Sequence, residues 1–330
     1  MPRLSVVIPT FNSEKTIEKC LRSIRSSFYP DYELIVVDSA SSDNTKYLAA
    51  KFADRVIELD GEPNRCRGRR LGFKHSSGSI LVNIDSDVLI RPDTLSKISE
   101  YFLRNPQVSA VTGILSKKNP YDDLFSQYKN LYLHHTFSRM PKSITFLYGS
   151  IYAFRSDVAG LCTDDTDLAS DDTAFGQRLF SRGKEINLLK DLEVTHLRRF
   201  TPVSLLKNDF KVPFEWGKIF VRYRGWQQLC RNRVGYAHAP VGQLISLVIS
   251  ISLLFVLFAF PPGHRAAYLY GLAGLWLLLN AGFTMFLRKE KGALFAGLCV
   301  PVIFIDNIIM ASGAFCGIIN ALFIRVKNKK

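Results

Sequence analysis

The chain has 330 residues, a net charge of +14 and an apolar share of 47%. Residues up to about 200 mix charged and apolar positions as a soluble domain does, whereas long stretches after Pro240 carry no charge. The six cysteines show no CxxC or CxxH spacing, which argues against a zinc site or a disulfide framework. The composition predicts a soluble head followed by a membrane tail.

The first half of the chain alternates strand and helix patterns. Strands are expected at 4–8, 33–37, 55–59 and 80–84, and helices at 13–26 with Ser13 as N-cap, from about 43, at 67–75 and at 94–104. A strand at 108–114 and a helix at 121–135 follow, and short strands with one helix at 172–182 occupy 145–196. This order predicts a doubly wound, mostly parallel α/β sheet with helices on both faces, within a domain of residues 1–200.

A basic, aromatic-rich segment at 201–238 comes before the apolar tail. Nine Lys and Arg lie between Arg198 and Arg233, against only Asp209 and Glu215. Basic residues beside a span attract anionic lipid and obey the positive-inside rule. We therefore expect amphipathic helices in the headgroup layer, with membrane and not nucleic acid as the partner.

Three apolar stretches, at about 241–260, 266–287 and 293–324, form the predicted transmembrane part at 239–330. The third is too long for one ordinary crossing and short for two, so it forms either one helix or a hairpin that turns near Asp306-Asn307. Asp306 would then be at the turn, paired inside the bundle, or functional. The opening Met-Pro-Arg has no secretory signal pattern, so we expect a multi-pass cell-membrane protein whose catalytic domain is cytoplasmic.

Asp85 and Asp87 follow the apolar run at 80–84, at the sheet edge where open α/β sheets bind ligands. In an extended chain residues i and i+2 point the same way, so both carboxylates could bind one Mg²⁺ or Mn²⁺ beside substrate phosphates. The alternative is a solvated turn that uses Asp for its own hydrogen bonds.

Six motifs follow one another along the chain: SVVIPTFNSEKTIEKCLRSI, VVDSASSDNT, Arg65–Gly72, Asp85-Ser-Asp87, Tyr148-Gly149-Ser150, and Asp171-Asp172 to Arg178-Leu179. By these motifs the chain resembles membrane-attached family 2 glycosyltransferases of the GT-A fold, over about residues 4–200. Arg65–Gly72 stands in place of the family's A-R-N-x-G, with Arg70 replacing the asparagine; Asp85-Ser-Asp87 matches its D-x-D, and Asp171-Asp172 to Arg178-Leu179 resembles its E-D-x-x-L-x-x-R-L.

The resemblance implies roles for single residues. It assigns the nucleotide sugar to Pro9, Thr10, Phe11, Glu14, Asp38, Asp43, Arg69, Asp85 and Ser86; the metal to Asp87, Asp85 and His196; the acceptor to Gly149, Ser150 and Arg178; and catalysis to Asp172 and Asp171. Arg69 would clamp the diphosphate, and Asp172 would be the base. The structural alternatives are helix capping for the aspartates, a solvated basic face for the arginines and a purely structural histidine.

The implied activity is an inverting, metal-dependent transfer from a UDP- or GDP-sugar to a hydroxyl of a lipid or lipid-linked acceptor. The segment Asp85–Asp93 lacks the D-A-D-L-Q-H-P-P-E run of polyprenyl-phosphate sugar transferases, and no Q-x-x-R-W of processive synthases follows Asp172. A polyprenyl-phosphate glycosyltransferase and a non-catalytic, nucleotide-binding membrane protein are the alternatives.

Overall fold

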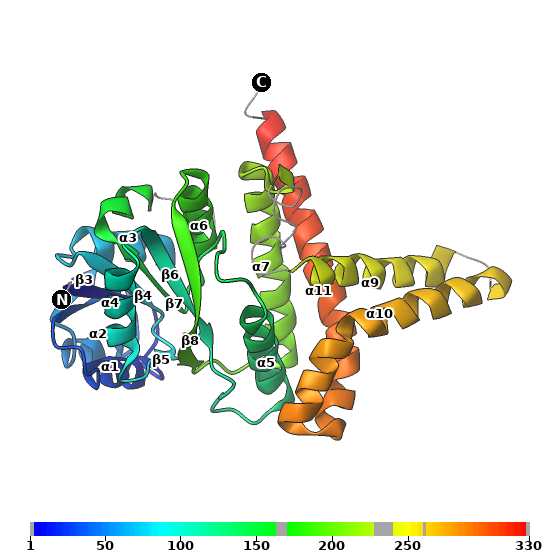
Figure 1. The fold of residues 1–330 in the computed structure, drawn as a ribbon, viewed down its shortest axis with the longest axis horizontal. Helices are drawn as coiled ribbons and strands as arrows, with labels where there is room; N and C mark the ends of the chain where they lie inside the picture. The colour runs from blue at the N-terminus through cyan, green and yellow to red at the C-terminus, as the bar shows by residue number, and fades with distance from the viewer. Residues whose placement is uncertain (1–2, 163–169, 228–239, 260–261, 328–330) are drawn as a thin grey trace. The chain divides into compact units, whose positions relative to one another are not determined.

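The computed structural model describes residues 3–162, 170–227, 240–259 and 262–327 (Figure 1). The chain divides into two compact units: an α/β unit, Met1–Pro120 with Met140–Arg198, and a helical unit, Tyr121–Arg139 with Arg199–Lys330. Residues 121–139, expected within the α/β domain, therefore group with the helices that follow it. The physical reason is that their helix packs against the apolar helices of the tail.

One eight-stranded sheet, in the order β3-β2-β1-β4-β7-β6-β8-β5, forms the centre of the α/β unit. Its strands are β1 Leu4–Thr10, β2 Tyr32–Asp38, β3 Arg55–Glu58, β4 Ile80–Ile84, β5 Val88–Leu89, β6 Val108–Leu115, β7 Ile151–Arg155 and β8 Glu185–His196. β1 to β4 are parallel, as expected, and β8 is parallel to β6. However, β7 is antiparallel to both β4 and β6, so the sheet is mixed.

Helices cover the sheet at α1 Ile17–Arg25, α2 Thr45–Ala50, α3 Arg65–Lys74, α4 Thr94–Arg104 and α6 Asp171–Ser181, with a 3₁₀ helix η1 at Ser156–Leu161. β1, β4 and β6 are buried along their whole length, as expected for strands covered on both faces. The predicted N-cap Ser13 is wrong: α1 begins at Ile17 with Thr16 as its cap residue. The Ser13 hydroxyl instead bonds the Phe11 carbonyl and the Ser86 hydroxyl.

The helical unit contains α5 Leu124–Ser138, α7 Pro202–Arg222, α9 Val241–Ala259, α10 Pro262–Lys291 and α11 Ala293–Lys327. Three helical segments, Val241–Ala259, Ala266–Lys291 and Ala293–Ile324, are long and apolar enough to cross a membrane. Figure 1 shows α11 as one continuous helix, coloured orange to red, so the hairpin alternative is wrong. Its 35 residues span about 52 Å, more than a bilayer core of about 30 Å.

Small residues bring α7 and α11 together. A Cβ added at Gly313 would meet the Phe210 carbonyl, and one added at Gly317 would meet the Phe214 carbonyl. Glycines permit such close backbone approach between helices. The headgroup location of 201–238 stays a prediction, and residues 228–239 lie outside the described part of the chain.

A buried polar cluster joins α5, α7 and α11. Lys129 Nζ lies 2.6 Å from Asp209 Oδ1, and the Tyr128 hydroxyl donates to Asp306 Oδ2 at 2.7 Å. Of the three alternatives for Asp306, the structure shows pairing inside the bundle.

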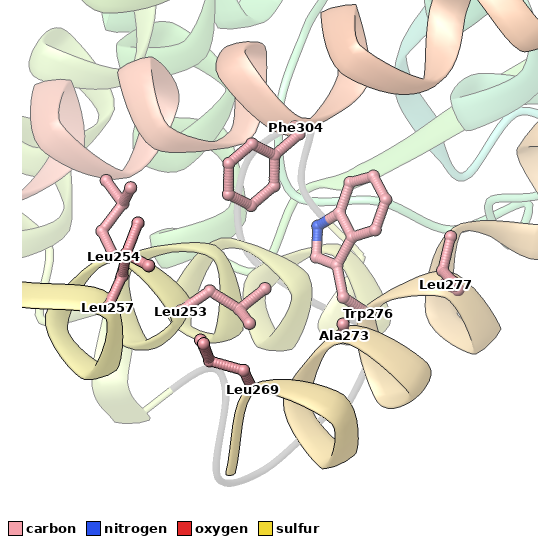
Figure 2. A pocket seen from close by; sticks show the side chains of 8 residues that line it. All are labelled: Leu253, Leu254, Leu257, Leu269, Ala273, Trp276, Leu277 and Phe304. Atoms are coloured by element: carbon pink, nitrogen blue, oxygen red, sulfur yellow. The ribbon is translucent and has the colours of Figure 1, made fainter. Parts of the chain in front are cut away.

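A hollow of about 370 Å³ lies between α9, α10 and α11 (Figure 2). Its walls are the side chains of Leu253, Leu254, Leu257, Leu269, Ala273, Trp276, Leu277 and Phe304. The Trp276 indole N–H is already bonded to the Ser250 hydroxyl. No lining side chain in this hollow carries an acid or base, so the candidate chemistry lies in the α/β unit.

Candidate functional site

The loops after β1 and β2 lie side by side because the two strands are parallel neighbours in register, with Thr10 opposite Asp38. Asn12 and Ala40 both have positive φ, at 47° and 57°, a backbone conformation that non-glycine residues rarely adopt. The Asn12 N–H donates to the Ser41 hydroxyl, and the Ser42 N–H donates back to the Asn12 side chain. The two predicted nucleotide-binding loops thus form one surface.

The acids of these loops hold the loops to each other. The Glu14 N–H donates to Asp43 Oδ2 at 3.2 Å, and Glu14 Oε2 accepts from the Asn44 N–H at 3.2 Å. Asp38 is 1% exposed, and both its oxygens accept from Ser41. Glu14 and Asp43 therefore organise the loops, while base and ribose contacts by these acids stay predictions.

The other residues predicted to bind the nucleotide differ in accessibility. Phe11 is 45% exposed and free to present its ring, whereas Thr10 is buried in β1. Pro9 is also buried there, opposite Val37 of β2. Ser86 lies in the turn after β4, bonded to the Ser13 hydroxyl at 2.9 Å. The structure thus places Ser86 beside the first loop.

The D-x-D segment is a tight turn: the Val88 N–H donates to the Asp85 carbonyl at 3.1 Å. The assumption of extended chain was therefore wrong, and the two carboxylates have different partners. Asp85 Oδ1 accepts from Arg69 Nη2 at 2.7 Å. Asp87 Oδ2 instead lies 3.1 Å from His196 Nε2. β5 brings His196 there, since Val88 pairs with it across the β5–β8 ladder.

Asp87 is held ionised by its surroundings. Burial alone would raise its pKa, but the His196 ring and then Arg198 outweigh burial and lower the pKa to about 2. A third of the Asp87 side chain is nevertheless exposed, so its charge faces outward. This carboxylate can accept a cation or a hydrogen-bond donor at neutral pH.

A divalent cation fits this turn only in part. Among the described residues, no three His, Cys, Asp or Glu side chains are arranged to hold a metal by themselves. Mg²⁺ commonly binds through one or two carboxylates and completes its shell with substrate phosphates and water. The donor set of Asp87 with His196, and Asp85 nearby in the turn, suits that mode and does not suit a closed protein cage.

Arg69 connects the turn to α6. Its side chain is fully buried, and Nη1 donates to both oxygens of Asp171 at 2.8 and 2.9 Å. Nε donates to Asn83 Oδ1 at 3.0 Å, and Asn83 Nδ2 donates to the Gly149 carbonyl at 2.7 Å. Asn83 was not among the predicted site residues; it is the single polar residue in the apolar run of β4, which is the signal that could have revealed it.

Gly149 lies against three of these groups. A Cβ built there would be 2.8 Å from Asp172 Oδ2, 3.0 Å from Arg69 Nη2 and 3.5 Å from Asp85 Oδ2. The structure therefore gathers Asp85 and Asp172, which are far apart in sequence, around one glycine. No side chain larger than hydrogen fits there without moving a carboxylate.

Asp172 has the environment of a general base. It is half-buried at the start of α6, and its Oδ1 accepts from the Thr173 N–H at 2.8 Å. Burial, and then the adjacent Asp171, raise its pKa, while Arg69 and Arg65 oppose the rise. A carboxylate with a raised pKa is a better proton acceptor than an ordinary one.

The remaining acceptor-side residues are placed differently. Ser150 is 4% exposed beside Gly149, and its carbonyl accepts from the Asp85 N–H. Arg178 donates to the Leu161 carbonyl at the end of η1. The structure therefore brings Gly149 and Ser150, but not Arg178, to the D-x-D turn.

The sheet and this cluster of acids place the candidate site within the α/β unit. Residues 5–160 match the sequence model of Glycosyl transferase family 2, so this segment is a family 2 glycosyltransferase domain, as the motifs predicted.

Two curated relatives illustrate the match. Glycosyltransferase AglE of Haloferax volcanii is 37% identical over 94 residues, which is 26% of this chain and 31% of AglE. WfgD of Escherichia coli, a UDP-Glc:alpha-D-GlcNAc-diphosphoundecaprenol beta-1,3-glucosyltransferase, is 30% identical over 105 residues, 31% of this chain and 42% of WfgD. The aligned part spans about a third of the first relatives, at 31%, 28% and 32% of their lengths.

One solved structure is similar over nearly the whole chain. The mannosyltransferase PcManGT of Pyrobaculum calidifontis, in complex with GDP-Man and Mn²⁺, superposes with a TM-score of 0.60 at 18% identity, over 98% of this chain and 88% of PcManGT. The similarity confirms the GT-A type of α/β fold followed by helical segments.

Proposed function

We propose that the chain is an inverting, metal-dependent glycosyltransferase, which moves a sugar from a nucleotide diphosphate donor to a hydroxyl of a lipid or lipid-linked acceptor. The observation that carries the proposal is the convergence of Asp172 and the D-x-D turn on Gly149. A transfer reaction of this kind needs a base on one side of the reacting carbon and, on the other side, carboxylates that hold a cation. The convergence supports this proposal because it brings Asp172 close to the turn that contains Asp87.

Asp172 would take the proton of the acceptor hydroxyl as its oxygen attacks the anomeric carbon. The bond from that carbon to the donor diphosphate breaks in the same step, and a single displacement inverts the carbon. Asp172 Oδ2 faces the space at Gly149, whereas Oδ1 is held by the Thr173 N–H. A positioned base typically contributes about 10²- to 10⁴-fold.

Asp87 and His196, with Asp85 nearby, would hold Mg²⁺ or Mn²⁺ together with the donor diphosphate. Such a cation supplies neutralisation of the charge that develops on the leaving diphosphate. PcManGT is similar in fold and was solved with Mn²⁺ and GDP-Man, which supports a divalent cation and a GDP-linked donor here. The name of WfgD gives UDP-Glc as its donor, which supports a UDP-linked donor as the other candidate.

The acceptor side is proposed to lie at the cytoplasmic face of a cell membrane, with the three apolar helices as a multi-pass anchor. Three helices of sufficient length and apolarity support anchoring. WfgD acts on a diphosphoundecaprenol-linked sugar, which supports a lipid-linked acceptor for a related domain.

The test is a screen of UDP- and GDP-sugars with the full chain in lipid, with Mg²⁺ or Mn²⁺, that measures release of nucleoside diphosphate with and without added membrane lipids. We expect release to require both the cation and the lipid. Asp172→Asn should abolish release and leave UDP or GDP affinity unchanged, whereas Asp157→Asn, at an exposed acid of η1, should remain active.

Other results would favour the alternatives. Nucleotide binding without turnover of any donor would make the chain a nucleotide-binding membrane protein. An active Asp172→Asn variant that transfers sugar to a lipid phosphate would indicate the polyprenyl-phosphate type, because a phosphate acceptor needs no base.

A further inference from the structure

The buried Arg69 guanidinium is held in one orientation by hydrogen bonds from all of its nitrogens. The guanidinium of Arg69 is planar and rigid, so several hydrogen bonds to it fix direction as well as distance. Here the three nitrogens donate to Asp171, Asp85 and Asn83 at distances from 2.7 to 3.0 Å. The side chain is 0% exposed, so water does not compete for these bonds.

The partners of Arg69 come from the two halves of the proposed site. Asp85 opens the turn that contains Asp87, on the cation and diphosphate side. Asp171 starts α6 and directly precedes Asp172, on the base side. The buried Arg69 guanidinium therefore joins two segments that lie far apart along the chain. Arg65 also approaches both carboxylates, but it is half-exposed and lies 4.0 Å from each, beyond hydrogen-bonding distance.

These bonds also conflict with the roles that the motifs imply for Arg69 and Asp171. To reach a donor diphosphate, the Arg69 guanidinium would have to leave two carboxylates in a buried place. Both oxygens of Asp171 accept from Arg69, so Asp171 is a poor candidate for proton acceptance from a substrate. By contrast, Asp172 keeps one oxygen toward Gly149.

We propose that Arg69 is a positioning residue, which holds Asp85 and Asp171 at a fixed separation, and that Asp171 is its counter-ion and not a second base. The proposal rests on the proposed function, since it assigns the two halves as cation side and base side. It predicts that Arg69 controls the rate of transfer and not the affinity for the donor nucleotide.

Arg69→Lys is the informative variant because it keeps the positive charge and loses the planar guanidinium with its several N–H donors. A lysine ammonium cannot hold both carboxylates and Asn83 in this arrangement. We expect kcat to fall about 10²-fold, the cost of a misplacement near 1 Å, while the Kd of UDP or GDP with Mn²⁺ stays within about threefold.

Arg155→Lys is a matched control. Arg155 is a partly buried arginine that, like Arg69, donates through more than one nitrogen of its guanidinium, but its acceptors are the Val108 and Phe102 carbonyls at the other end of β7. Its replacement should lower the unfolding temperature and leave kcat unchanged. Thermal unfolding of both variants separates a loss of folding from a loss of positioning.

A second variant covers the case in which Arg69→Lys does not fold. Asp171→Asn keeps the shape and one acceptor oxygen, and we expect a smaller loss of kcat with unchanged nucleotide affinity. If Arg69 and Asp171 act as one unit, Arg69→Lys with Asp171→Asn should lose no more than the larger single loss.

Four results would overturn the proposal. Weakened nucleotide binding with normal kcat in Arg69→Lys would make Arg69 a donor clamp, and losses that multiply in the double variant would make Asp171 an independent catalytic group. If the wild-type chain is active and Arg69→Lys is just as active, the positioning role is refuted while the proposed function stands. A wild-type chain that turns over no donor refutes the proposed function, and the positioning role of Arg69 in transfer with it.

Discussion

Replacement of Gly149 by alanine should slow transfer by displacing the base. The added Cβ would lie 2.8 Å from Asp172 Oδ2, whereas ordinary contact begins at 3.4 Å. The Arg69 side chain, with Nη2 at 3.0 Å from the added Cβ, is fully buried and held by Asp85 and Asp171, so it cannot yield easily. Asp172 must therefore withdraw by about 0.6 Å, and since 1 Å of misplacement can cost about 10²-fold, we expect kcat to fall roughly ten- to a hundredfold.

The assay is nucleoside diphosphate release at saturating donor, together with the Kd of UDP or GDP in the presence of Mn²⁺. The nucleotide affinity should change little, because the new methyl group would be 3.5 Å from Asp85 Oδ2, an ordinary contact. Gly160→Ala is the matched control, since a Cβ at Gly160 meets nothing within 4 Å. A Gly149→Ala variant as active as Gly160→Ala would refute the assignment of Asp172 as a base held beside Gly149.

Three further outcomes follow from the structure. Burial and Asp171 raise the pKa of Asp172 above its ordinary 3.8, so kcat should fall with decreasing pH through a value higher than 3.8; a kcat that stays level down to about pH 4 contradicts this. Gly317→Ala would push α11 away from the Phe214 carbonyl, and it should destabilise the helical unit by about 1–3 kcal/mol in thermal unfolding. Gly297→Ala is the control on the same helix: a Cβ there meets nothing within 4 Å, so stability should not change. Lys129→Met should cost about 3–5 kcal/mol in thermal unfolding because it leaves the buried Asp209 carboxylate without its cation. Asp306→Asn should cost less, because the amide oxygen can still accept from the Tyr128 hydroxyl; equal losses would contradict the assignment of the ion pair to Lys129 and Asp209.

The sequence alone determined those features that depend on neighbouring residues. The apolar runs in the sequence predict β1, β2 and β4 as buried strands, and the structure confirms them. The ends of these strands place Phe11, Asp38 and Asp85 at one edge of the sheet. The same local logic identified three apolar helices and the acids of the D-x-D turn.

Only the tertiary structure decided which partners these residues have. Arg69 is one of four arginines at the start of α3, and helical periodicity cannot tell which of them is fully buried and donates to Asp171, 102 residues away. Likewise, the antiparallel pairing of β7 with β4, and the formation of α11 as one continuous helix, depend on packing between distant segments. A local pattern carries the preference for strand or helix, but a buried charge finds its counter-charge only when the chain has folded, because that pairing is what offsets the cost of its burial.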